Sequence, residues 1–123
     1  MDAPQLPEPR DLLDLVQDAI FVVDEQGDFL YISAGVQNLL GYRPAEMMGK
    51  NMIEFVHPDD RGRTLNRVWH IMEGVTATRF INRWMHKYGH PVLVEWAASW
   101  SAKHRIRIAT ARGVEQPEER PGS

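Results

Sequence analysis

The sequence contains no cysteine, and this absence excludes several classes of site at once. The chain cannot form disulfides, bind a metal through thiolates or use a cysteine nucleophile. It also has no apolar run of about 18 residues, so we expect no transmembrane segment. Its first residues, MDAPQLP, lack the basic and apolar regions of a secretory signal. Together these absences are typical of a cytoplasmic protein, which is the localisation we predict.

The charge balance indicates that nucleic acid is not a partner. The 123 residues carry a formal net charge of −3, and no basic cluster interrupts this acidic balance. A phosphate backbone would therefore be repelled rather than bound. Hydrophobic residues make up 43% and charged residues 25% of the chain, which is ordinary for one globular domain of this length.

The spacing of apolar residues predicts the order of helices and strands. Residues 1–10 contain three prolines and predict a flexible leader, while residues 115–123 predict a polar tail. Helical spacing predicts a flanking helix at 11–19, short helical pieces between 36 and 56, and a longer helix from about 60 to 73. Alternating or β-rich runs predict strands at 20–24, 29–33, 80–85, 91–100 and 106–112.

This order predicts an α+β fold. Two strands are separated by helices from a meander of three strands, which favours one five-stranded antiparallel sheet with short helices packed on one face. The N-terminal helix would flank that sheet.

Four motifs resemble those of the PAS domain family. Residues 24–33 (DEQGDFLYIS) resemble its opening hairpin, and residues 38–50 (NLLGYRPAEMMGK) resemble its N-x-L-G-Y … E-x-x-G-K core. Residues 57–61 (HPDDR) match the step before its long helix, and residues 83–89 (RWMHKYG) resemble its next hairpin. The resemblance implies a PAS-like fold over residues 11–114. It also implies a sensory or regulatory module of signal transduction rather than an enzyme.

The end of the matching region departs from the family pattern. Family members often end in D-I-T or D-V-T, whereas this chain has Gly113, Val114 and Glu115 followed by prolines. No kinase, cyclase or DNA-binding segment follows. We therefore expect the signalling output domain or partner protein to lie outside this chain.

The resemblance restricts the cofactor without naming one, and the cofactor stays unknown. The light-sensing flavin branch carries G-x-N-C-R-F-L-Q, where this chain has GKNMIEFV at residues 49–56. Met52 replaces the adduct-forming cysteine, so covalent flavin chemistry is excluded and only non-covalent flavin stays open. In rhizobial oxygen sensors the haem-binding histidine falls near Thr64. His70 is the only histidine on this helix, and its helical position points to solvent, so haem is not expected.

The tryptophans predict either a ligand pocket or a filled core. Strand parity places Trp84, Trp96 and Trp100 on one sheet face, and Trp69 belongs to the apolar helix stripe Leu65/Val68/Trp69/Met72 that should cover it. An aromatic-walled pocket would take a planar or apolar small molecule. Alternatively the rings fill the space, which we favour because Trp84 and Val94 stand where flavin-binding relatives place polar groups. The candidate lining comprises Met52, Phe55, Trp69, Met72, Asn82, Trp84, Val94, Trp96, Ala109 and Ala111.

Two polar clusters could suggest catalysis. His86, His90 and His104 with Glu95 could form a metal-dependent enzyme site, but an i, i+4 pair converges only on a helix, so we expect surface imidazoles and no metal. The adjacent carboxyls 59–60 are better explained as a helix cap than as an acid–base pair.

An apolar outer sheet face predicts self-association. Strand parity places a set of large apolar side chains opposite the helices, and a monomer rarely leaves such a surface in water. We therefore predict a homodimer, with a ligand-free dimerisation or docking domain as the alternative to a sensor. The candidate interface comprises Leu12, Leu15, Val16, Ile81, Met85, Leu93, Ile106 and Ile108.

Overall fold

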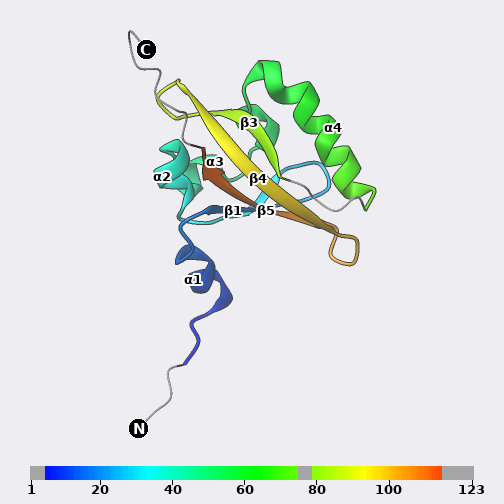
Figure 1. Ribbon diagram of the computed structural model, residues 1–123. Coiled ribbons are helices and arrows are strands. Elements are labelled where there is room, and N and C mark those ends of the chain that lie inside the picture. Colours follow the sequence, from blue (N-terminus) through cyan, green and yellow to red (C-terminus); the bar gives the residue numbers. More distant parts are fainter. Residues whose placement is uncertain (1–4, 75–78, 115–123) are drawn as a thin grey trace.

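The computed structural model describes residues 5–74 and 79–114 (Figure 1). The predicted tail at 115–123 and the first four residues of the predicted leader lie outside these ranges. The elements in chain order are Pro9–Asp14 (α1), Ala19–Val23 (β1), Phe29–Ile32 (β2), Val36–Leu40 (α2), Pro44–Met47 (α3), the 3-10 helices Met52–Phe55 (η1) and Pro58–Asp60 (η2), Arg61–Met72 (α4), Phe80–Met85 (β3), Pro91–Ser101 (β4) and Ile106–Gly113 (β5).

The five strands form one antiparallel sheet in the order β2-β1-β5-β4-β3, which confirms the predicted fold class. The helices α2 and α3 contact β1 and β2, and α4 contacts β4. Figure 1 shows these helices on one side of the sheet, with α1 projecting away from it. The long strands β4 and β5 lie centrally, and their register places Trp96 opposite Ala111 on the face toward the helices.

The flanking helix is shorter than predicted. It begins at Pro9, inside the predicted leader, and ends at Asp14, whereas Ala19 begins β1 and is buried. Ala19 fits the helical spacing, but it pairs with Ala111 in the β1–β5 ladder, and this pairing decides its conformation.

Polar contacts attach the flanking helix to the domain. The carboxylate of Asp14 accepts hydrogen bonds from the Tyr31 hydroxyl at 2.8 Å and from the Ala34 amide at 3.0 Å. Burial and the Asp14 carboxylate raise the pKa of Tyr31 to about 12. Leu12, Leu15 and Val16 stay exposed and α1 projects away from the sheet, so the helix does not cover the outer sheet face.

The long helix is rotated relative to its predicted orientation. Its buried residues are Thr64, Val68 and Ile71, while Leu65 and Trp69 are 52% and 64% exposed. Both sets satisfy the i, i+4, i+7 spacing of a helix face, so the sequence pattern permits either orientation. The prediction that Trp69 covers the sheet was wrong because polar contacts to β3 orient the helix.

The first of these contacts is an ion pair that replaces the predicted helix cap. Asp60 precedes α4, but its side chain makes no capping hydrogen bond. Its carboxylate accepts from Arg83 Nη2 at 2.8 Å, from Arg83 Nε at 3.1 Å and from the Arg83 amide at 2.8 Å. The Arg83 hydrogen bonds lower the pKa of Asp60 to about 2. A two-pronged guanidinium is a stronger partner than a helix amide, which explains the change.

We expect Asp60→Asn to lower the free energy of unfolding by about 2 kcal/mol at neutral pH, because it removes charged hydrogen bonds from a buried carboxylate. The pKa of Asp60 lies below its ordinary 3.8, so its contribution is complete above that pH and is lost as the pH falls through about 2. Chemical denaturation from neutral to acidic pH measures both effects. The exposed Asp59→Asn is the control, and equal losses for the two variants would contradict this role for the pair.

Two glycines with the same backbone conformation offer a second test. Gly41 and Gly49 have φ of +79° and +83°, where a side chain costs about 1 kcal/mol or more. A Cβ at Gly41 would lie 2.4 Å from His86 Cε1, whereas nothing lies within 4 Å at Gly49. Gly41→Ala should therefore lower the Tm more than Gly49→Ala. Equal shifts would show that the β3–β4 turn does not pack on Gly41.

Candidate ligand-binding site

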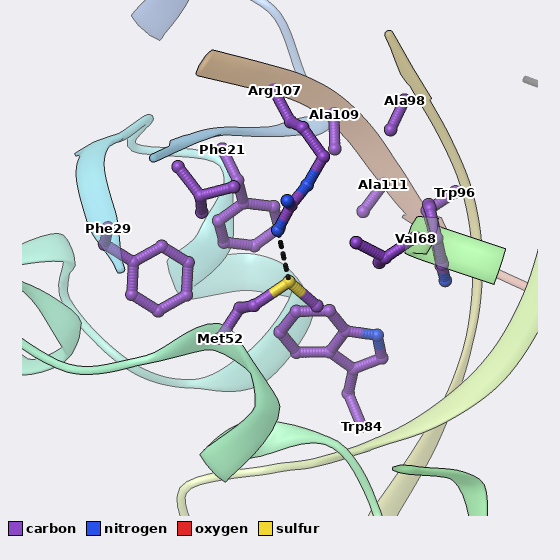
Figure 2. Close-up of a pocket in the computed structure, with 11 residues that line it drawn as sticks. Phe21, Phe29, Met52, Val68, Trp84, Trp96, Ala98, Arg107, Ala109 and Ala111 are labelled. Atoms are coloured by element: carbon purple, nitrogen blue, oxygen red, sulfur yellow. Dashed lines mark hydrogen bonds between the residues drawn. The ribbon is translucent and has the colours of Figure 1, made fainter. Parts of the chain in front are cut away.

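A small cavity lies between the inner face of the sheet and α4 (Figure 2). Its volume is about 30 Å³, which holds one or two water molecules. Aromatic side chains form one part of its wall and alanines of β4 and β5 the other. The lining comprises Phe21, Val23, Phe29, Met52, Val68, Trp84, Trp96, Ala98, Arg107, Ala109 and Ala111.

Stacked aromatic rings fill most of the space beside the cavity. The rings of Phe21 and Trp84 lie 5.5 Å apart and nearly parallel, and Phe29 packs on Phe21 at 5.6 Å. A residual space persists because Ala109 and Ala111 present only methyl groups to these rings. The structure thus combines both interpretations of the tryptophan cluster, with a largely filled core and a small remaining cavity.

The two buried indoles of the cavity differ in their hydrogen bonds. Trp84 Nε1 donates to Asn82 Oδ1 at 2.8 Å, and Asn82 Nδ2 donates to Thr64 Oγ1 at 2.9 Å. This chain of hydrogen bonds also joins β3 to α4. Trp96 Nε1, by contrast, is buried and has no hydrogen-bond partner among the residues that the structure describes. Buried donors are nearly always paired, so this indole N–H is an exception among the buried groups of the described residues.

Arg107 is the functional candidate that the sequence analysis missed. Its side chain is buried, and Figure 2 shows the guanidinium pointing from β5 toward Met52. Its nitrogens donate to Met72 Sδ at 3.2 Å, to Met52 Sδ at 3.8 Å and to the Glu25 carbonyl at 3.4 Å. Burial lowers the pKa of the guanidinium, and the charge of Asp24 partly offsets this effect.

No carboxylate in residues 5–74 and 79–114 forms an ion pair with Arg107. Strand parity could have identified this residue, because Arg107 shares a face with Ala109 and Ala111, which were predicted to point inward. The signal in the sequence is a single cationic residue at a strand position whose side chain is predicted to point inward.

An outer groove of about 350 Å³ adjoins the cavity. Met52, Val68 and Arg107 line both spaces, so these three side chains separate the groove from the cavity. The groove lies between the β1–β2 turn, the start of η1 and one side of α4. Its lining comprises Glu25, Gln26, Gly27, Asn51, Met52, Leu65, Val68, Trp69, Met72 and Arg107.

The predicted lining residues are divided between three places. Met52, Trp84, Trp96, Ala109 and Ala111 line the cavity, and Trp69 and Met72 line the outer groove together with Met52. Three others are buried but belong to the lining of neither space: Phe55, Asn82 and Val94.

The histidines of the possible metal cluster are not brought together. His86 and His90 stack at 4.2 Å in the β3–β4 turn, whereas His104 follows β4 at its opposite end. Glu95 instead pairs with Arg79 and Arg112. Within the described ranges, no three histidine or carboxylate side chains are placed to hold a metal ion.

The position expected for a haem ligand is occupied by a hydrogen-bonded hydroxyl. Thr64 is buried and accepts from Asn82, while His70 is exposed, as its helical position predicts. In the same described part of the chain, no helix has the length and apolar character needed to cross a bilayer.

Comparison with known proteins relates this arrangement to sensory domains. A family model described as the PAS fold matches residues 29–110. The blue light receptor lreA of Aspergillus flavus is 29% identical over 101 residues, which cover 80% of this chain and 11% of that protein. The chain therefore spans only a small part of this curated relative.

Solved structures share the fold at low sequence identity. A PAS domain of a protein from Colwellia psychrerythraea has a TM-score of 0.76 at 23% identity, covering 85% of this chain and 92% of that one. The PAS domain of the Cronobacter turicensis quorum-sensing receptor RpfR, in complex with BDSF, has a TM-score of 0.69 at 13% identity, covering 81% and 96%.

Proposed function

The chain belongs to the PAS family, whose members are sensory domains of signalling proteins, and we propose that it senses a small molecule held beside α4 and relays its presence to a partner. The partner or output domain lies outside residues 1–123, and the module acts in the cytoplasm without catalytic activity of its own. The single observation that carries this proposal is the buried Arg107 guanidinium, which lines both the cavity and the outer groove and whose acceptors among the described residues are two sulfur atoms and one carbonyl.

A ligand in this place has a direct route to the opposite face of the sheet. Arg107 points toward the ligand space, while its neighbours Ile106 and Ile108 point to the outer face of the same strand. A ligand that moves the Arg107 side chain would therefore strain β5 and alter the surface that these isoleucines form. The RpfR domain, solved in complex with BDSF, supports the use of this fold for holding a small molecule, as an analogy of fold.

A ligand-free docking domain is the alternative. The small cavity volume and the stacking of Phe21 on Trp84 favour it, because both are also features of an ordinary core.

Outer-face exposure favours a homodimer as the second part of the proposal. Ile81 and Ile108 are each 42% exposed, and α1 projects away from the sheet (Figure 1). Met85, Leu93 and Ile106 are half-buried on the same face. Leu12, Leu15 and Val16 are exposed on and just after α1. A second copy of this chain, which carries the same surface, would bury both sets of side chains.

We expect natively purified protein to release a small molecule on denaturation, in near-stoichiometric amount by mass spectrometry. Trp69→Ala removes an exposed wall of the outer groove and should release far less while keeping the Tm, because this indole is largely in water. Tyr88→Ala, at an exposed aromatic side chain of the β3–β4 turn, should behave like the natural chain. Absence of any released molecule from all three proteins would support the ligand-free alternative.

Sedimentation tests the homodimer at micromolar concentration. Leu93→Asp and Leu12→Asp should each shift the protein from dimer to monomer while leaving it folded, since a charge would be buried in the interface. Met48→Asp, on an exposed side chain of the opposite side, should leave the dimer intact. A folded natural chain that stays monomeric at high concentration would disprove the interface.

A further inference from the structure

The wall of the outer groove contains two large apolar side chains that the fold leaves in water. Leu65 and Trp69 lie one turn apart on α4 and are 52% and 64% exposed. Both belong to the groove lining, with Met72 one turn further on. Tryptophan beside a concave surface is suited to hold a flat or apolar group by stacking, because it offers a large area at little conformational cost.

The floor of the same groove carries a cation whose present partners are poor. Two of the three acceptors of Arg107 are thioether sulfurs, which accept hydrogen bonds weakly. A guanidinium can instead donate two parallel hydrogen bonds to one carboxylate, which are much stronger. The side chain is also 4% exposed, so a carboxylate placed there would interact with little screening by water.

The acidic residues of the neighbouring turn are already engaged. Asp24 Oδ1 accepts from the amides of Gln26 at 2.9 Å and Asp28 at 3.0 Å, and Asp28 Oδ1 accepts from Asn51 Nδ2 at 3.0 Å. The Glu25 carboxylate pairs with Arg105. These groups do not neutralise Arg107 by direct contact, but their negative charge disfavours a doubly charged ligand.

We propose that the outer groove binds a small monocarboxylate with an apolar ring, its carboxylate on Arg107 and its ring against Trp69. This inference rests on the proposed ligand-binding function and specifies the chemical class of the ligand. The groove volume of about 350 Å³ falls within the range usual for small-molecule sites. The carboxylate replaces the sulfur atoms of Met52 and Met72 as acceptor, and the nearby acidic turn disfavours a dianion such as a phosphate monoester.

A matched pair of probes tests the charge requirement. We would titrate the protein with 3-phenylpropionate and with the isosteric neutral 3-phenylpropanamide, and follow the indole N–H signals by ¹H–¹⁵N NMR. The expected result is at least tenfold tighter binding of the acid, with the Trp69 indole signal shifting most. The Trp69 signal is assigned from its loss in Trp69→Phe.

Variants then test the two contacts separately. Arg107→Gln should reduce acid binding to the level of the amide, whereas Arg112→Gln, the same change at an exposed position of β5, should have no effect. Trp69→Ala, on an exposed residue, should weaken both probes without loss of folding. Tyr88→Ala, at an exposed aromatic side chain of the β3–β4 turn, is its control.

The outcomes separate this inference from the proposed function. Equal affinities for the acid and the amide would overturn the requirement for a carboxylate on Arg107. The proposed sensory function would be unaffected by this result. If the Trp96 indole signal shifts instead of the Trp69 signal, the ligand binds in the inner cavity. That result would overturn the proposal that it binds in the outer groove. Absence of binding by both probes overturns the inference, and absence of a released molecule from the purified protein overturns the function as well.

Discussion

The polar contacts that join Asp60 and α4 to β3 determine the arrangement of the candidate site. The Asp60 carboxylate binds Arg83, and Asn82 binds the Thr64 hydroxyl, so the start of the helix is held to an edge strand at two levels. A helix held in this way turns Thr64 toward the sheet, where its hydroxyl accepts a hydrogen bond from the buried Asn82 amide, a group that would be costly to leave unpaired. The orientation of the whole helix follows from this constraint.

The cavity and the groove are consequences of that orientation. Val68 is brought against the alanines of the inner sheet face, where small side chains leave a space that the aromatic rings do not fill. Trp69 is turned outward, where it forms a wall of the groove instead of a part of the core. Between the two spaces lies Arg107, a cation in apolar surroundings whose neighbours are sulfur atoms rather than carboxylates.

The two faces of the sheet have different physical roles. The inner face encloses the small cavity, whereas the outer face presents isoleucines of β3 and β5 that no helix of residues 5–74 and 79–114 covers. Because alternate residues of β5 belong to opposite faces, a movement of Arg107 and a movement of Ile108 are coupled through one backbone. Under the proposed function, this coupling would supply a short path from ligand to partner without any rearrangement of the fold.

The sequence by itself determined the element order, the sheet and the inward positions of Trp84, Trp96, Ala109 and Ala111, because strand parity is a local property with a period of two. Only the tertiary structure decided the rotation of α4. Two residue sets on that helix satisfy the same spacing, and the choice between them depends on hydrogen bonds to β3, which is distant in sequence. The same reason explains Asp60, whose capping role was locally plausible but whose partner, Arg83, lies 23 residues away. Arg107 stood at a recognisable inward position, yet its lack of a carboxylate partner emerges only when the neighbouring elements are assembled around it.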